Sequence, residues 1–185
     1  MAEHVILFAG PMGAGKTTAI STLSEIPVVS TEAANSERDV VDKATTTVAL
    51  DYGEIMVGDD EKVRLYGVPG QRRFDFMWSI LRERARGLVL LVNNDAPDAV
   101  ALAVEYLASF EDLLEHGSVV VAVASLDLAP EPALADYQAA LAAAWPGAMI
   151  PVLSLDPRNS SQMQTALLML VAILDARASM MEVAR

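Results

Sequence analysis

The chain has 185 residues, of which 53% are hydrophobic, and it carries a formal net charge of −12 and no cysteine. This length and apolar fraction indicate one globular domain spanning residues 1–185. The negative charge argues against a surface for nucleic acid or anionic membrane, and the lack of cysteine excludes disulfides and thiolate metal sites.

Short apolar runs alternate with helix-like segments along the chain. Strands are predicted at 5–9, 48–57, 62–66, 88–92, 119–124 and 149–153. Helices are predicted at 17–24, 73–86, 99–114, 130–145 and 162–183. This alternation indicates a three-layer α/β fold with a six-stranded, mainly parallel sheet, one antiparallel hairpin strand and about five helices. Ligands of such sheets bind at the carboxyl ends of the strands.

Residues 26–47 form a long polar stretch, which inside a compact domain is typical of a functional loop. No run reaches the roughly 18 apolar residues of a transmembrane helix. The first residues also lack the basic region of a signal peptide. We therefore expect a cytoplasmic protein without a membrane anchor.

The segment from Gly10 to Thr17 fits the pattern G-x-x-x-x-G-K-[ST], between a predicted strand and a predicted helix. Glycines allow successive backbone N–H groups to point at an anion, and the helix N-terminus adds the positive end of its dipole. Lys16 is expected to reach the β- and γ-phosphates of a nucleotide, and the Thr17 hydroxyl to ligate Mg²⁺. The predicted contacts are Gly10, Met12, Gly13, Ala14, Gly15, Lys16, Thr17 and Thr18.

The phosphate loop, the element order and the loop positions resemble the small Ras-like GTPase domain over nearly the whole chain. More narrowly, they resemble the bacterial branch that includes the MglA-type motility switches and related ATP/GTP-binding proteins. This resemblance implies a P-loop G domain that binds GTP or GDP with Mg²⁺. It makes Thr47 the first-switch threonine, which ligates Mg²⁺, with Thr46 as the alternative. The threonines here also fit the plain opening of a β-strand.

The segment Val68-Pro69-Gly70-Gln71 resembles the second switch of the family. The resemblance implies that the Gly70 N–H contacts the γ-phosphate and that Gln71 orients the attacking water, so Gln71 and Lys16 are the predicted catalytic residues. Gly67 stands where the family carries a carboxylate that supports Mg²⁺. Asp51, on the neighbouring predicted strand, supplies this carboxylate if its side chain faces the site; a solvated edge position is equally open.

The family's base-recognition motif, Asn-Lys-x-Asp, falls on Ala124-Ser125-Leu126-Asp127. Asp127 is retained and its carboxylate can accept both N1–H and N2–H of guanine. The asparagine that braces the phosphate loop and the lysine that covers the base are missing. Asp127 also fits a helix N-cap before Pro130. The segment 154–156, Ser-Leu-Asp, is a poor match to the family's Ser-Ala-Lys loop.

An apolar stripe formed by Phe74, Met77, Trp78 and Leu81 follows the second switch at helical spacing. We expect it to be mainly core, with Phe76 or Trp78 as the exposed partner contact. The resemblance suggests a Roadblock-type dimeric regulator as partner. Met12 stands where Ras-type proteins carry glycine beside the γ-phosphate, and a side chain there tends to crowd an arginine delivered by a partner. We expect slow hydrolysis that needs a partner to become fast.

Three functions compete at this point. The first is a GTP-binding molecular switch with slow, magnesium-dependent hydrolysis. The second is an ATP-dependent P-loop phosphotransferase, for which the sequence shows neither a second substrate site nor an arginine-rich lid. The third is a degenerate G domain that acts as an interaction scaffold, which the losses at Gly67, Ala124 and Ser125 keep open.

Overall fold

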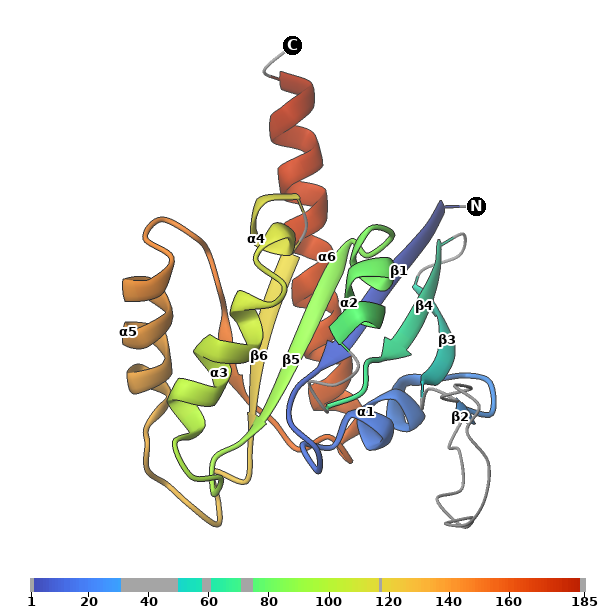
Figure 1. Cartoon of the computed structure of the whole chain (residues 1–185). Coiled ribbons are helices and arrows are strands. Elements are labelled where there is room, and N and C mark those ends of the chain that lie inside the picture. Colours follow the sequence, from blue (N-terminus) through green and yellow to red (C-terminus); the bar gives the residue numbers. More distant parts are fainter. Residues whose placement is uncertain (1, 31–49, 58–60, 71–74, 117, 184–185) are drawn as a thin grey trace, which may run out of the picture.

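The computed structural model describes residues 2–30, 50–57, 61–70, 75–116 and 118–183. Within these ranges one sheet runs through the molecule, in the spatial order β2-β3-β4-β1-β5-β6-β7 (Figure 1). The strands are β1 (Ala2–Ala9), β2 (Val29–Ser30), β3 (Asp51–Val57), β4 (Glu61–Gly67), β5 (Gly87–Asn93), β6 (Ser118–Ala124) and β7 (Val152–Ser154).

Most neighbouring strands in this sheet are parallel. β1 pairs in parallel with both β4 and β5, and β5, β6 and β7 continue in the same direction. β3 is antiparallel to β4 and to the short β2. The predicted mainly parallel α/β fold with one hairpin is therefore confirmed, and β2 adds a seventh strand within the stretch expected to be a loop.

Helices cover both faces of the sheet. They are α1 (Lys16–Leu23), α2 (Asp75–Arg82), α3 (Ala99–Ala108), α4 (Asp112–His116), α5 (Leu134–Ala144) and α6 (Ser160–Val183). Side chains of α1 and α6 pack in one core cluster, and side chains of α2, α3 and α5 pack in the other. The expected helix 99–114 is instead two helices, because the backbone turns at Ser109 and continues as α4.

The alternation of side chains along β1 explains the two layers of core. Ile6 and Phe8 point to the α1–α6 side, whereas Leu7 and Ala9 point to the opposite side, and all four are fully buried. β5 and β6 are buried along almost their whole length. A strand that is covered on both faces reads as a continuous apolar run, which is why the sequence identified these strands.

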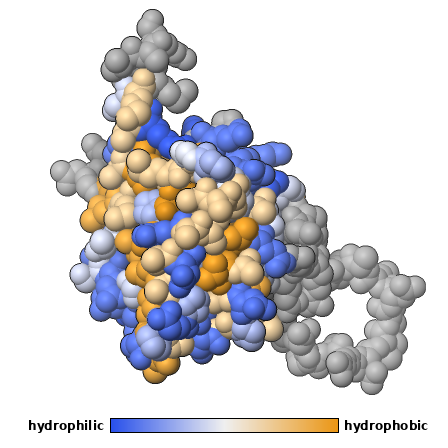
Figure 2. All heavy atoms as spheres, turned by 90° about the vertical axis from the view of Figure 1, so that its left-hand side faces the viewer, coloured by the Kyte–Doolittle hydropathy of each residue, from blue (hydrophilic) through white to orange (hydrophobic). Residues whose placement is uncertain are grey.

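The last helix, α6, extends well beyond the sheet toward the C-terminus (Figure 1). Its segment Ser160–Met180 is long and apolar enough to cross a membrane by length and composition alone, and 28% of that window is buried in the protein. Its first half contributes Met163, Ala166 and Leu170 to the core, as a core helix does. The face of the molecule beside α5 mixes apolar and hydrophilic residues (Figure 2).

Candidate nucleotide-binding site

The phosphate loop connects the end of β1 to the start of α1 at the carboxyl edge of the sheet (Figure 1). Gly10, Gly13 and Gly15 have φ angles of 139°, 81° and 92°, a region that L side chains rarely adopt. At Gly10 an added Cβ would lie 2.0 Å from the Leu91 carbonyl oxygen. The loop conformation therefore requires these glycines.

Lys16 folds over the loop from the first turn of α1. Its Nζ donates hydrogen bonds to the carbonyl oxygens of Gly10, at 2.9 Å, and Pro11, at 2.8 Å. Burial lowers the pKa of Lys16 to about 8, against the opposing influence of the Asp51 carboxylate. The ammonium group is thus held against the backbone of the loop, where a bound anion would stabilise its charge.

Asp51 lies opposite the start of α1. The Thr17 hydroxyl donates a hydrogen bond to one oxygen of the Asp51 carboxylate, and the Ser30 hydroxyl donates to the other at 2.7 Å. Because β3 lies between β2 and β4, Asp51 is not on an edge strand. The side chain faces the predicted metal ligand Thr17, as the hypothesis of a relocated carboxylate requires.

Gly67 is the register partner of Asp51 on β4. A Cβ added at Gly67 would lie 3.1 Å from the Asp51 Cβ and 3.2 Å from its Oδ2, and 3.0 Å from the Ile20 Cδ1. A larger side chain at position 67 would therefore compete with Asp51 for the same space. Gly67, where the family carries its carboxylate, and Asp51, which carries the carboxylate present here, are therefore register partners on neighbouring strands.

Gly70 lies directly against the phosphate loop. A Cβ at this residue would be 2.7 Å from the Met12 nitrogen and 2.8 Å from the Gly10 carbonyl oxygen. The Tyr106 hydroxyl donates to the Gly70 carbonyl oxygen at 2.6 Å, and Trp78 Nε1 donates to Pro69 at 3.2 Å. The backbone expected to sense the γ-phosphate is thus tied to α2 and α3.

Trp78 is 3% exposed and stacks on Phe110 with ring centroids 5.2 Å apart. The expectation that Trp78 is a candidate exposed contact is therefore wrong, because its indole is needed to pack α2 on the core. The side chains of Phe74, Phe76 and Met77 lie outside the described residues. Thr47, its alternative Thr46, and Gln71 also lie outside them, so their predicted roles are carried forward as proposals.

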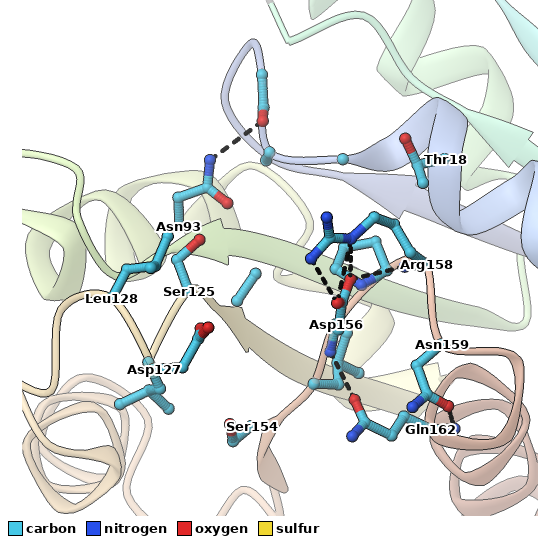
Figure 3. A pocket seen from close by; sticks show the side chains of 17 residues that line it. Thr18, Asn93, Ser125, Asp127, Leu128, Ser154, Asp156, Arg158, Asn159 and Gln162 are labelled. Carbon is cyan, nitrogen blue, oxygen red and sulfur yellow. Dashed lines mark hydrogen bonds and ion pairs between the residues drawn. The ribbon is translucent and has the colours of Figure 1, made fainter.

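A pocket of about 550 Å³ runs from the phosphate loop to the ends of β6 and β7 (Figure 3). Gly13, Gly15 and Thr18 line one end, Arg158 lies beside them, and Asp127 lies on the other side of the pocket. The sequence prediction placed Asp127 and the phosphate loop in one site, and the structure brings both to the same pocket. Asp127 is exposed, and Ser125 before it has a left-handed φ of 62°, a conformation that concentrates at functional sites.

Asn93 was missed by the sequence analysis. Its Nδ2 donates to the Gly13 carbonyl oxygen at 3.1 Å (Figure 3). Asn93 is the register partner of Ala124, the position at which the family's bracing asparagine is missing. A brace for the phosphate loop is therefore present on β5 instead of β6. Its only sequence signal is a polar residue directly after the apolar run 88–92.

Asn94, the next residue, holds the loop that carries Asp127. It is buried, and its Nδ2 donates to the carbonyl oxygens of Ala129, at 2.6 Å, and Pro132, at 2.9 Å. Its Oδ1 accepts a hydrogen bond from the Tyr137 hydroxyl at 2.7 Å. Burial raises the pKa of Tyr137 to about 12, so this hydroxyl remains a donor at neutral pH. The base loop is thus fixed by a buried polar network.

The helix-cap alternative for Asp127 is not what the structure shows at the start of α5. That helix begins at Leu134, and Asp136 accepts a hydrogen bond from the Ala133 N–H at 2.8 Å.

No cluster of three or more histidine or acidic residues suited to a metal occurs in the described part of the chain. The Thr17 hydroxyl and the Asp51 carboxylate, which are hydrogen-bonded to each other, are oxygen groups of the kind that Mg²⁺ binds.

The fold and the phosphate loop define a P-loop nucleotide-binding protein with the GTPase fold. The G domain of the FeoB iron transporter from T. maritima is 15% identical and matches 91% of this chain and 99% of its own, with a TM-score of 0.61. The small GTPase Arl6 (BBS3) from Trypanosoma brucei, solved with the nucleotide analogue GppNp, is 11% identical and matches 95% of this chain and 99% of its own, with a TM-score of 0.67. At these identities the likeness shows the fold alone.

Residues 8–144 match a family model described as "Conserved hypothetical ATP binding protein". Because the match covers more than half of the chain, the chain belongs to that family. The comparison with curated proteins gave no match. The likeness to the MglA-type branch stays a prediction.

Proposed function

We propose that the protein is a magnesium-dependent GTP-binding switch that hydrolyses GTP slowly. The observation that carries this proposal is the continuous pocket that joins the phosphate loop to Asp127. A nucleotide whose phosphates lie on the loop would extend its base toward that carboxylate. The Ras-like resemblance predicts the same arrangement, with the phosphates on the loop and the base at Asp127.

The chemistry of Asp127 favours guanine over adenine. An ionised carboxylate is an acceptor only, and it can take two parallel hydrogen bonds. Guanine presents the adjacent donors N1–H and N2–H, whereas adenine presents an acceptor at N1. Since Asp127 is the acidic residue on the β6–α5 side of the pocket, we assign it the base edge.

The residues at the start of α1 fit a magnesium ion bound together with phosphates. Mg²⁺ prefers oxygen ligands and usually keeps several waters, held through one or two carboxylates and phosphate oxygens. Thr17 offers a hydroxyl, and the adjacent Asp51 offers a carboxylate positioned by Ser30. When bound, the ion would neutralise charge that develops on the β- and γ-phosphate oxygens. Thr47 completes this proposed ligand set.

Hydrolysis and signalling belong to the same proposal. Lys16 would stabilise phosphate charge, the Gly70 N–H would contact the γ-phosphate, and Gln71 would orient the attacking water. Met12, which is 75% exposed beside the loop, would restrict access of a partner's arginine. The proposal also includes a low intrinsic rate, a protein regulator at the switch segments, such as the Roadblock-type dimer that the resemblance suggests, and a cytoplasmic location.

The decisive test is base selectivity in the nucleotide-stripped protein. Calorimetric titration with GTP, GDP and ATP, each with Mg²⁺, should show guanine nucleotides binding more tightly than ATP. The variant Asp127→Asn should lose affinity for GTP and gain affinity for xanthosine triphosphate. An amide can donate to the C2 carbonyl of xanthine while still accepting from N1–H. Retained GTP binding in Asp127→Asn, without a gain for xanthine, would contradict the assignment of Asp127.

The family description gives one specific reason to keep a second candidate, an ATP-dependent phosphotransferase. Equal or tighter binding of ATP in the same titration would favour it. Lack of binding by any of these nucleotides would leave the non-hydrolysing scaffold.

A further inference from the structure

The nucleotide pocket contains one cationic side chain that does not belong to the phosphate loop. All the residues that line this pocket lie in the described part of the chain. Arg158 is the only basic residue among them. Ser125 stands where the resemblance would place a lysine that covers the base. Arg158 comes instead from the loop between β7 and α6, on the other side of the pocket from Asp127 (Figure 3).

The orientation of Arg158 is fixed by Asp156. Nε and Nη2 of the guanidinium donate to the Asp156 carboxylate, with the shortest contact 2.7 Å from Nη2 to Oδ2. The Arg158 backbone N–H donates to Asp156 Oδ1 at 2.9 Å, and the Asp156 N–H donates to Gln162 Oε1 at 2.6 Å. The side-chain and backbone hydrogen bonds from Arg158 lower the pKa of Asp156 to about 2, so the pair stays ionised at neutral pH.

The loop that carries this pair is anchored against the phosphate loop. The ring of Pro157 closes over Gly15, where an added Cβ would lie 2.9 Å from the proline Cγ. Arg158 is therefore held next to the phosphate loop, yet its side chain is 81% exposed and the guanidinium reaches into the pocket (Figure 3). A planar, preoriented cation that borders open space is suited to stacking on an aromatic ring.

We propose that the guanidinium plane of Arg158, clamped by Asp156, stacks on the purine ring of the bound nucleotide and replaces the missing base-covering lysine. This inference rests on the proposed nucleotide-binding function and adds a determinant of affinity to it. Asp127 then binds the edge of the base, and Arg158 covers one of its faces. Asp127 and Arg158 line the same pocket. The pKa of Arg158 is raised mainly by its hydrogen bonds and charge interaction with Asp156, and to a smaller extent by the Asp127 carboxylate.

If the Asp156–Arg158 ion pair only stiffened its own loop, a different experimental result would be expected. An exposed ion pair between residues two apart contributes little to stability and needs no contact with a ligand. Removing it would act equally on every ligand of the phosphate loop. Stacking on the base, in contrast, acts only on ligands that contain a base.

The test compares GDP, ADP and inorganic tripolyphosphate by calorimetry in the wild type and in the variants Arg158→Ala and Arg158→Lys. We expect Arg158→Ala to weaken the preferred nucleoside diphosphate about threefold to thirtyfold and to leave tripolyphosphate within about twofold. The affinity of Arg158→Lys for the preferred nucleoside diphosphate should lie between those of the wild type and Arg158→Ala, because lysine keeps the charge but lacks the planar guanidinium. Arg84, an exposed arginine just before β5, provides the matched control, and Arg84→Ala should leave the affinity for all three ligands unchanged.

The outcomes separate this inference from the proposed function. Unchanged affinity for the preferred diphosphate in Arg158→Ala, or an equal loss for the diphosphate and tripolyphosphate, would overturn the stacking role. A wild type that prefers ADP, with the loss in Arg158→Ala then seen for ADP, would uphold the stacking role and contradict guanine selectivity. A wild type that binds tripolyphosphate and neither nucleotide would overturn both.

Discussion

Asp51 and Gly67 face each other across one register position of the β3–β4 ladder, and the Asp51 carboxylate fills the space beside the glycine. Asn93 and Ala124 are likewise register partners, on β5 and β6. In both pairs, the side chain that the Ras-like resemblance expects on one strand is small or absent. In both, a polar side chain of the same chemical type stands on the neighbouring strand. Both pairs support the proposal of a rearranged nucleotide-binding site.

The brace from Asn93 gives the first prediction. Asn93→Ala removes the hydrogen bond to the Gly13 carbonyl, so the phosphate loop should be less well ordered for any phosphate ligand. Loss of one such bond corresponds to about 0.5–1.5 kcal/mol, or about twofold to tenfold in affinity. Calorimetry should show this loss for both GDP and tripolyphosphate. A loss confined to GDP would place Asn93 at the base instead of the loop.

The buried network around Asn94 predicts an effect on stability. Tyr137→Phe removes the donor to Asn94 Oδ1 and leaves that oxygen buried without its partner. The free energy of unfolding should fall by about 1–3 kcal/mol, measured by urea denaturation. Tyr66→Phe on β4 is a partly buried control in which no such loss is expected. Equal stability of Tyr137→Phe and the wild type would show that the network does not hold the base loop.

The lowered pKa of Lys16 leads to a prediction about how phosphate binding depends on pH. Its pKa of about 8 in the free protein is low because of burial, and a bound phosphate favours the charged form. Above that pH the free protein must take up a proton to bind, so GDP affinity should fall by up to about tenfold per pH unit.

Lys16→Arg provides the comparison, because arginine stays protonated throughout this range. GDP titrations at a series of pH values should show a steeper fall for the wild type than for the variant. Parallel curves would mean that Lys16 does not change its protonation on binding.

Gly70 predicts a conformational effect. In Gly70→Ala the new methyl group would meet the Met12 nitrogen at 2.7 Å, so the segment should move off the phosphate loop. Trp78 donates to Pro69 and should report this movement by its fluorescence. Trp145→Phe leaves Trp78 as the sole tryptophan and is the background for the measurement. An unchanged spectrum in Gly70→Ala would indicate that the segment is not coupled to α2.

The sequence was sufficient to predict the fold and the phosphate loop, because both depend on local patterns. Buried parallel strands read as apolar runs, and the loop needs glycines at set positions followed by Lys16 and Thr17. The side chain direction of Asp51 could be anticipated only as one of two alternatives from the strand period. Deciding between them required the pairing of β3 with β4 and the position of α1.

The contributions of Asn93 and Arg158 could not be read from the sequence in the same way. Asn93 acts through strand register, which joins residues far apart in the chain. Arg158 acts through a loop whose shape depends on its own bonds to Asp156 and on the packing of Pro157. The turn at Ser109, which divides one predicted helix into α3 and α4, was also hidden by a continuous helical pattern.

Exchanging Asp51 and Gly67 tests the rearranged site most directly. The measurement is GTP affinity with and without Mg²⁺ for the wild type, Asp51→Gly, and the double variant Asp51→Gly/Gly67→Asp. We predict that Mg²⁺ strengthens binding by at least about tenfold, or about 1.4 kcal/mol, in the wild type. Asp51→Gly should lose most of this gain while keeping its magnesium-free affinity, and the exchanged pair should recover it. Undiminished strengthening by Mg²⁺ in Asp51→Gly would contradict the account.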